Sequence, residues 1–560
     1  MNAAAEEKTV ENFRQILFWP LRLMPVTSGG QIHEHWQLLE KASGDGPWQL
    51  EEDAFTPDPA QFRERHYIEF ITFLPYVQRL LYGEGGKSTT ALGGHSPVRV
   101  FRRRDIAAVD LVFPGDDSVL QLRVARTELF FFYDLDIVIL VLEIGGEGLG
   151  LQRAQEVLFR FGRAYPHFWH ADGRPSNCLK RVAWLGVDGA ELAASDYEQR
   201  PRYLTFVATH RAPCIAAHWE FLLEPLVPHY SDKTGALRIR QLEYHRMPLM
   251  AYLAVNDMQE LTRADFIRLG LVTPPGESTD LPYASGYLDD FERRFCYDRF
   301  HESRTTAASS DTRIMCCGHA FIMVGNSRDP FFVDTETGLA AQFDHPYFVL
   351  GLVAHMHKAA LLMLRDCLNG AVGRLDIGNV ESIKQFKRSI RHTMEIFLRF
   401  THRYWFQEIS IQVQARDLFH MWRHHLSTSE LYIEVRQEVH DMSTYLDSDG
   451  LRRQADTVLR LTVVTVFGLI GTFASGILGM NLFDETSRPP LVKLLIFLVV
   501  AVPATLLTLY TVMRSRRLSD FLDALSNDRT ALGAKLAALA NVWRRRLRTG
   551  QKAEDLNRRD

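Results

Sequence analysis

Two long apolar stretches with almost no charge, joined by a short segment, constrain this chain more than any other feature. The first runs from Leu461 to Met480, and the second runs from Leu491 to Met513 and carries only Lys493. Each has about twenty residues, which is enough for a helix to cross the hydrocarbon core of a bilayer. We therefore predict a transmembrane hairpin over 459–513, with spans at about 459–480 and 491–513.

The charges around the hairpin predict its orientation. The short connection is net acidic, whereas arginines flank the other ends of both spans: Arg452, Arg453, Arg460, Arg514, Arg516 and Arg517. The positive-inside rule places these ends, and both termini, in the cytoplasm of a bacterial-type inner or plasma membrane. The first residues lack the basic and apolar regions of a signal peptide, and six scattered cysteines fit a reducing compartment.

The N-terminal part, 1–345, is predicted to be a cytoplasmic α/β domain with a mixed sheet. Its run Ile137–Leu142 is rich in β-branched residues, which is typical of a strand covered on both faces. A helix is expected over Gln152–Phe161, and another starts after Thr262 as N-cap. The strands that we expect are Phe18–Val26, Val98–Phe101, Val119–Val124, Ile137–Glu143, Tyr203–Ala208 and Ala320–Val324.

Residues 346–458 are predicted to form a cytoplasmic helical and stalk region. We expect a helix over Pro346–Leu368, a turn over Leu368–Gly373, and a second helix from Asn379 to about Leu426. A capping box of Ser427 and Glu430 should start a third helix, which need not stop before the membrane; if it is continuous, it runs from Thr428 to Met480.

The apolar face of that third helix predicts an oligomeric bundle, because such a stripe needs partners to cover it. Its residues are Leu431, Val435, Val439, Met442 and Leu446. Residues 514–560 are expected to form a cytoplasmic amphipathic helical tail. The fold class is thus an α+β membrane protein.

The end of the first span carries Gly479-Met480-Asn481, preceded by Thr472-Phe473-Ala474-Ser475-Gly476-Ile477-Leu478. This run, placed before a short outer loop and after a long helix, resembles the signature of the CorA-type two-span divalent-cation transporters. Val458–Val464 resembles the stretch where the stalk of that family enters the membrane. The chain departs from the family pattern at Gly468–Gly471, where relatives have a proline, and at Leu478, where they have a tyrosine.

The resemblance implies a homopentamer whose first span lines an axial pore. Gly479, Met480 and Asn481 would form the selectivity ring at the outer mouth, and Thr472 would face the pore one layer deeper. Leu461, Leu469 and Val458 would be hydrophobic gate layers. In relatives, cytoplasmic metal bound between subunits holds the pore closed.

This chemistry suits a divalent cation, Mg²⁺ first and Co²⁺ or Ni²⁺ next. Mg²⁺ releases its water reluctantly, and neutral amide and backbone oxygens can bind the hydrated ion weakly enough to let it leave. Asp484 and Glu485 would concentrate cations outside. A potential of ~100 mV supplies about 4.6 kcal/mol for a divalent ion, so passive transport needs no nucleotide.

Alternative interpretations of these residues stay open. Asn481 could be a helix C-cap, and Asp484 and Glu485 could belong to an ordinary solvated loop. The Thr472 hydroxyl could bond back to its own helix, and Leu461 and Leu469 could face lipid or neighbouring helices.

Two other functions compete with Mg²⁺ transport. One is a zinc or other transition-metal transporter resembling ZntB, and another is a membrane-anchored metal sensor or scaffold. An enzyme is not expected, because no nucleophile–base arrangement can be inferred and the Gly145–Gly150 run lacks a Walker ending and is expected to be a turn. No tightly bound cofactor is expected, and the net charge of -4 gives no nucleic-acid footprint.

Two further clusters have mainly structural interpretations. His420, His424 and His425 lie on one predicted helix, and a surface or interface role is favoured over metal binding. Cys316-Cys317-Gly318-His319 lies beside a predicted strand and is expected to be buried and structural.

Overall fold

The computed structural model describes most of the chain up to Gly479 and little of it afterwards. The described residues are 8–24, 35–42, 46–51, 63–83, 97–132, 135–233, 235, 237–243, 245–276, 281–301, 311–376, 379–479, 489–492, 494–495, 498–499, 502–503 and 506.

The strands are β1 (Thr9–Leu23), β2 (Trp48–Leu50), β3 (Val98–Arg103), β4 (Ile106–Phe113), β5 (Asp116–Phe132), β6 (Ile137–Gly150), β7 (Arg181–Gly186), β8 (Glu191–Ala194), β9 (Val227–Pro228), β10 (Arg238–Gln241), β11 (Leu249–Val255), β12 (Cys296–Tyr297), β13 (Arg313–Cys316) and β14 (Ala320–Asn326).

The α-helices are α1 (His35–Ala42), α2 (Glu64–Thr72), α3 (Pro75–Tyr82), α4 (Leu151–Arg160), α5 (Arg200–His210), α6 (Ala217–Leu223), α7 (Arg263–Leu271), α8 (Ser285–Phe295), α9 (Pro330–Val333), α10 (Leu339–Gln342), α11 (Phe348–Gly373), α12 (Val380–Arg399), α13 (Val413–His425) and α14 (Thr428–Gly479). Short 3₁₀ turns lie at Met258–Glu260 and Asp298–Phe300, and π turns at Phe343–Tyr347 and Phe400–Tyr404.

The described strands form one mixed sheet, as the sequence predicted. The main path runs β12-β13-β14-β11-β1-β6-β5-β4-β7-β8, with β2, β3, β9 and β10 paired off it. Most pairs are antiparallel, but β11 pairs with β14 in parallel. The long strands β1 and β6 form the centre, paired from Thr9↔Gly150 to Arg22↔Ile137. This arrangement of a mixed sheet with helices is an α+β architecture.

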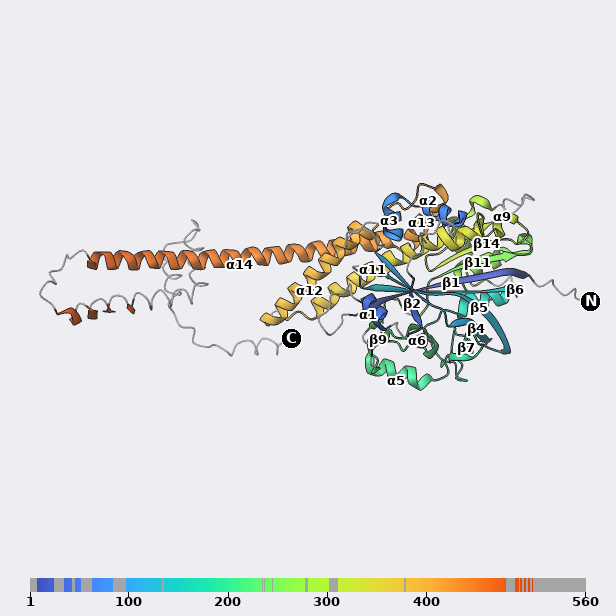
Figure 1. Cartoon of the computed structure of the whole chain (residues 1–560), viewed down its shortest axis with the longest axis horizontal. Coiled ribbons are helices and arrows are strands. Elements are labelled where there is room, and N and C mark those ends of the chain that lie inside the picture. The colour runs from blue at the N-terminus through green and yellow to red at the C-terminus, as the bar shows by residue number, and fades with distance from the viewer. Residues whose placement is uncertain are drawn as a thin grey trace, which may run out of the picture. The chain divides into compact units, whose positions relative to one another are not determined.

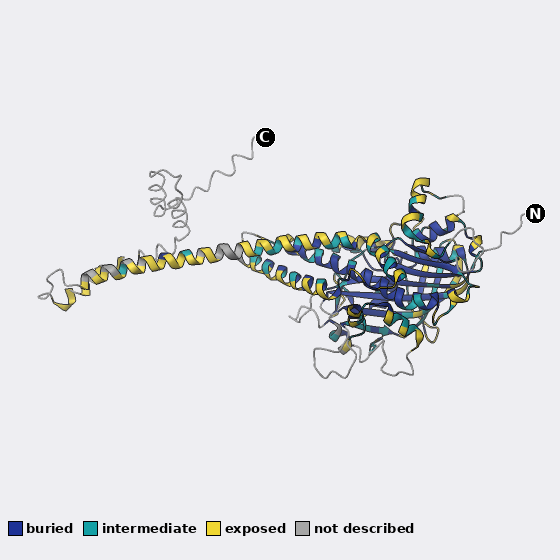
Figure 2. Cartoon of the chain, turned by 90° about the horizontal axis from the view of Figure 1, so that it is seen from above, coloured by how far each residue is buried: buried dark blue, intermediate teal, exposed yellow. Residues whose placement is uncertain are grey.

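Helices cover both faces of the sheet (Figure 1). On one face α11 lies against β1 and β6, and α13 lies against β13. On the other face α4 contacts β1 and β6, α6 contacts β7, and α7 contacts β14. Alternate residues of β1 serve the two layers: Phe13 and Leu17 join the core with α4, and the Phe18 ring stacks 5.8 Å from that of Phe348 on α11. Figure 2 shows the sheet as the most buried part of the chain.

The predicted strands are confirmed with one exception, Tyr203–Ala208, which lies in helix α5; of Phe18–Val26, the part up to Leu23 is in β1, and Pro25 and Val26 lie outside the described residues. Pro201 occupies the first turn of this helix, where its missing N–H costs nothing. Tyr203 is buried, whereas Leu204 and Val207 are exposed. A short apolar run cannot be assigned to strand or helix by its pattern alone. Here Pro201, in the first turn, is the signal that favours a helix.

The turn predicted over Gly145–Gly150 is wrong, because these residues are the end of β6 and pair with β1. Gly145 and Gly146 allow close packing in the sheet, whereas Gly148 has a positive φ of 65° and open space around it. A Cβ on Gly146 would lie 2.6 Å from the Leu122 side chain, and one on Gly145 would lie 3.2 Å from the Phe13 carbonyl oxygen. They mark close backbone approach rather than chain reversal.

The N-caps predicted for two helices are confirmed. The Thr262 side chain accepts from the Asp265 N–H in a capping box, and the Asn379 side chain accepts from the Glu381 and Ser382 N–H groups. Ser427, predicted to cap the third helix, has a positive φ of 51°, whereas an N-cap residue is usually extended.

Two predicted boundaries in the helical region are wrong. The expected turn at Leu368–Gly373 is the last part of α11. The expected second helix is two helices, α12 and α13, because the chain leaves the helix at buried Tyr404 after a π turn. The continuous helix that the sequence allowed is observed, because α14 begins at Thr428 and reaches Gly479 without a break; Met480 lies outside the described residues.

The chain divides into two compact units, Met1–Val439 and His440–Asp560, and the sheet with helices α1–α13 belongs to the first. The domain boundaries predicted at 345, 458 and 513 stay predictions.

Candidate pore-lining helix

The residues predicted to line a pore lie on one face of α14. At about 100° per residue, Val458, Leu461, Leu469, Thr472 and Gly479 fall within an arc of roughly 80°. Thr465 and Gly476 share the same arc. The spacing of three and four residues keeps this face continuous for six helical turns, about the thickness of a membrane.

The described side chains on this face are exposed. The exposed fractions of Val458, Leu461 and Leu469 are 63%, 67% and 70%, and Thr472 and Gly479 are also exposed. Figure 2 shows long exposed stretches of α14. Exposed apolar side chains in this number mark a surface that another helix or lipid covers.

The hydroxyl groups of this segment bond within the helix. Thr472 Oγ1 donates to the Gly468 carbonyl at 2.8 Å, Thr465 to Leu461 at 2.8 Å, and Thr462 to Val458 at 2.9 Å. The Thr472 bond matches the alternative interpretation given above, in which this hydroxyl bonds back to its own helix. A hydroxyl that donates its proton retains its lone pairs, so the exposed Thr472 oxygen can still accept hydrogen bonds from water.

Small residues leave room along this part of α14 for the close approach of another helix. A Cβ added at Gly468, Gly476 or Gly479 would meet nothing within 4 Å. Glycine, threonine and serine at such spacing let helix backbones pack closely in a membrane.

The first turns of α14, by contrast, are covered by the chain itself. Val435 is 0% exposed, and Val439 is also buried. Tyr432 stacks on Trp405 with ring centroids 4.4 Å apart and an angle of 7°, and it also stacks on Phe397. The argument that this part of the stripe requires partner subunits is therefore wrong; only the face from Val458 onward stays uncovered.

Several predicted site residues lie outside the described residues: Met480, Asn481, Asp484 and Glu485. The tail 514–560 and most of the second predicted span also lie outside them.

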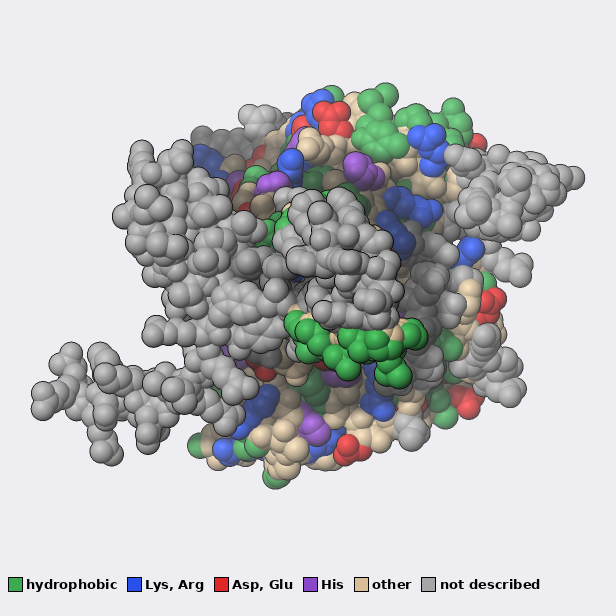
Figure 3. Space-filling model, turned by 90° about the vertical axis from the view of Figure 1, so that its left-hand side faces the viewer, with side chains coloured by type: hydrophobic (Ala, Val, Ile, Leu, Met, Phe, Trp, Pro, Cys, Tyr) green, Lys and Arg blue, Asp and Glu red, His purple; other side chains and the backbone are tan. Residues whose placement is uncertain are grey.

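Hydrophobic side chains gather on the face of the molecule shown in Figure 3. Within the second predicted span, Leu491, Leu494, Leu495, Leu498, Val499, Val502 and Leu506 are exposed.

In the described part of the chain, one helical stretch is long and apolar enough to cross a membrane, Leu339–Gly373. It is mostly buried inside the first unit, as the core helix of a globular protein is. It is neither of the predicted spans. A shorter apolar helix, Thr457–Val466, falls within the first predicted span. The location in a membrane and the orientation stay predictions.

In the two secondary clusters, His425, Cys316 and Cys317 have structural surroundings, whereas His420 and His424 are exposed. His425 Nε2 lies 2.8 Å from the Arg294 carbonyl oxygen, and its ring stacks on Phe295 with centroids 4.4 Å apart. Cys316 is fully buried, and burial raises the pKa of the Cys317 thiol to about 11. Nowhere in the described ranges do three or more histidine, cysteine, aspartate or glutamate residues form a group suited to a metal ion.

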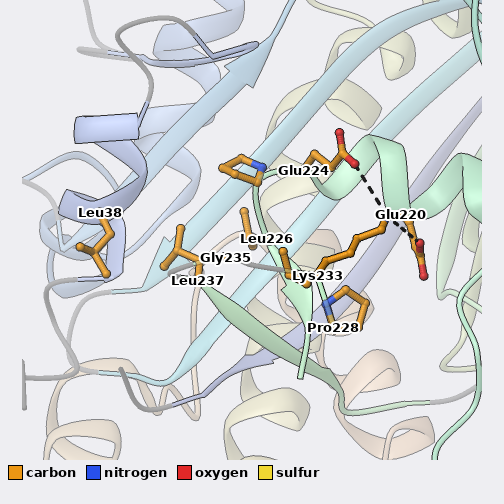
Figure 4. Close-up of a pocket in the computed structure, with 10 residues that line it drawn as sticks. Leu38, Glu220, Glu224, Leu226, Pro228, Lys233, Gly235 and Leu237 are labelled. Atoms are coloured by element: carbon orange, nitrogen blue, oxygen red, sulfur yellow. Dashed lines mark hydrogen bonds and ion pairs between the residues drawn. The ribbon is translucent and has the colours of Figure 1, made fainter. Parts of the chain in front are cut away.

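An open pocket of about 310 Å³ lies between α1, α6 and the strands β9 and β10 (Figure 4). Its floor is apolar, with Leu38, Leu226 and Leu237. At its edge Lys233 lies 3.2 Å from a Glu220 oxygen and 3.9 Å from a Glu224 oxygen. Sequence reasoning missed this pocket because Leu38 is far along the chain from the other lining residues, Glu220–Leu237. Lys233 pairs with both carboxylates and Arg202 lies 3.4 Å from Glu220, so these charges already have partners and do not point to an ion site.

Comparison with known proteins adds no family. No family model matches the chain, and no curated protein matches it. The resemblance to the CorA-type transporters therefore stays a prediction from residues 458–481.

Proposed function

We propose that this chain is the subunit of a homo-oligomeric, pentameric channel for a divalent cation, Mg²⁺ first, with Co²⁺ or Ni²⁺ also passing. The observation that carries the proposal is the uncovered face of α14, which holds every described residue predicted to line the pore. The helix reaches Gly479 without a break, directly before Met480 and Asn481. A ring of such helices would present one Asn481 amide from each subunit at the outer mouth.

The physical properties of the face support a bundle in a membrane. Leu461 and Leu469 lie about one turn and three turns into the predicted span. Rings of apolar side chains at these positions can exclude water from a narrow pore. Every described hydroxyl within Val458–Gly479 is bonded within its own helix, as polar groups in hydrocarbon must be. In such a bundle Gly468, Gly476 and Gly479 would permit close helix contacts.

The test is Mg²⁺ influx into proteoliposomes under an inside-negative potential. Wild-type protein is expected to conduct Mg²⁺. Asn481→Ala is expected to reduce influx to the level of empty liposomes while it still assembles as an oligomer of the same mass. Ser487→Ala, a change of similar size in the outer segment, is the matched control and should conduct like the wild type.

Each other outcome points to a different function. Influx of Zn²⁺ or Ni²⁺ without Mg²⁺ would indicate a transition-metal transporter. Conduction by Asn481→Ala equal to wild type would refute the selectivity ring. No influx of any divalent ion through a correctly assembled oligomer would refute transport and leave the membrane-anchored sensor or scaffold.

A further inference from the structure

Two arginines face each other in an isolated bridge in the first unit. Arg163, just after α4, pairs with Arg246, just before β11, in an antiparallel bridge outside the named strands. Residues directly opposite in such a pair lie on the same side of the backbone, and like charges placed so repel each other. Arg163 is only 4% exposed and Arg246 is half-buried.

Neither guanidinium has a counter-charge among the residues that the structure describes. Arg163 donates Nε to the Phe159 carbonyl at 3.1 Å and lies 2.9 Å from His245 Nε2. Arg246 donates Nη2 to the Val272 carbonyl at 2.7 Å. Its Nε is buried and, within the described ranges, has no hydrogen-bond partner.

The nearby groups are also basic. Burial and then the charge of Arg163 lower the pKa of Arg246 to about 9, and burial first and then Arg246 lower the pKa of His319 to about 3. Within the described part of the chain His319 Nε2 is buried without a partner, while its Nδ1 lies 3.4 Å from Cys317 Sγ. The adjacent carboxylate of Glu243 is already paired with Lys358.

This arrangement is costly unless an anion neutralises it. Buried charges in proteins are normally paired, and an arginine with an unused buried Nε–H has lost the hydrogen bond that water gave it. The cluster is open to solvent on one side, because His167 is exposed and its ring lies 5.0 Å from that of His245.

We propose that Arg163, Arg246 and His319 form a binding site for a phosphate-type oxyanion. The planar guanidinium forks match the oxygens of a phosphate, and two of them from facing segments can hold one phosphate between them. The ligand is inorganic phosphate or the phosphate of a nucleotide. The aromatic edge of Tyr165 and His167 beside His245 offers a surface for a base in the second case. This site is independent of the proposed channel.

The test measures the thermal unfolding temperature of the detergent-solubilised full chain against potassium phosphate, with potassium chloride at matched ionic strength. Wild-type protein should show a saturable rise that chloride does not give. Arg246→Gln should weaken the apparent affinity by about tenfold or more, since hydrogen bonds to a charged group are lost. Arg263→Gln is the matched control, because Arg263 is exposed and already paired with Asp289 and Glu292.

Without phosphate, Arg246→Gln should be no less stable than wild type, because it removes an unpaired charge. If that variant fails to fold, His319→Gln should give the same weakening. A parallel titration with ATP in EDTA distinguishes the ligands: tenfold tighter binding than phosphate indicates a nucleotide, and equal binding indicates free phosphate. No saturable rise with phosphate or ATP, or unchanged affinity in Arg246→Gln, would overturn the proposal.

Discussion

Glu143 is the centre of a buried charge network that ties the sheet to the start of α11. Its Oε1 accepts from Arg14 Nε at 3.1 Å and Nη2 at 2.5 Å, and its Oε2 accepts from Arg126 Nε at 3.0 Å and Nη2 at 2.8 Å. Arg14 also donates Nη1 to Asp344, in the π turn before α11, at 2.7 Å. Arg126 lies over the Phe348 ring, 4.3 Å from its centroid.

We predict that Glu143→Gln strongly destabilises the first unit. The change keeps the shape but removes the charge, which leaves Arg126 without its carboxylate and Arg14 with Asp344 alone. Removing one partner of a buried ion pair costs about 3–5 kcal/mol. The unit ends at Val439, so its unfolding entropy is about 0.9 kcal/mol/K, and the unfolding temperature should fall by roughly 3–6 °C.

The pH dependence gives an independent check on this magnitude. Burial opposes the charge of Glu143, but Arg126 and Arg14 outweigh it and lower the pKa from 4.5 to about 2. A lowered folded-state pKa stabilises the fold above the unfolded pKa, and this stability is lost as pH falls from 4.5 to 2. At about 1.4 kcal/mol per pKa unit the loss is on the order of 3 kcal/mol, the same order as the mutational figure.

The assay is thermal unfolding of the full chain at pH 7 followed by near-ultraviolet circular dichroism. Glu147→Gln is the matched control, since Glu147 makes the same charge change from an exposed position on the same strand. It should stay within about 1 °C of wild type, because surface changes alter stability by about 0.5 kcal/mol or less. An unfolding temperature for Glu143→Gln as high as that of the control would refute the reasoning.

Two further predictions concern the packing and titration of α11 and α13. Trp422→Ala should lower the free energy of unfolding by about 3–5 kcal/mol, because fully buried Trp422 stacks on Phe321 with centroids 4.4 Å apart. Chemical denaturation measures this loss. Phe331→Ala, at an exposed aromatic residue, is the control and should lower it far less. Burial lowers the pKa of His357 to about 3, so its stabilisation is complete above pH 6.5 and is lost as pH falls toward 3. His357→Gln should therefore reduce the pH slope of unfolding free energy in that window by up to about 1.4 kcal/mol per pH unit, and an unchanged slope would contradict this.

Much of the fold could be predicted because local signals and packing agree. Ile137–Leu142 reads as a strand covered on both faces, and it is the buried centre of the sheet. Thr262 and Asn379 carry capping signals that need no tertiary information. The glycines of Gly145–Gly150 misled the prediction, because close approach to Leu122 and a turn require the same residue type.

The arginine cluster could not be predicted from the sequence. Arg163 and Arg246 are far apart in the chain, and each has ordinary neighbours in the sequence. Only the bridge between the segments before β11 and after α4 brings them together. Arg14, Glu143 and Asp344 are likewise far apart in the sequence, and each one taken alone resembles an ordinary charged surface residue.

The composition of the uncovered α14 face favours contact with other helices over contact with lipid along its whole length. A face that meets only lipid has no reason to carry glycine, since large apolar side chains cover the backbone better. Here Gly468, Thr472, Gly476 and Gly479 lie among Leu461, Thr465 and Leu469, and the glycines have open space around them. Small residues are favourable where the backbone of another helix comes close. The large residues lie toward the start of the predicted span and the small ones toward Gly479. In the proposed channel this gradient would make the bundle narrow and apolar at one end, and it would present backbone and amide oxygens at the other.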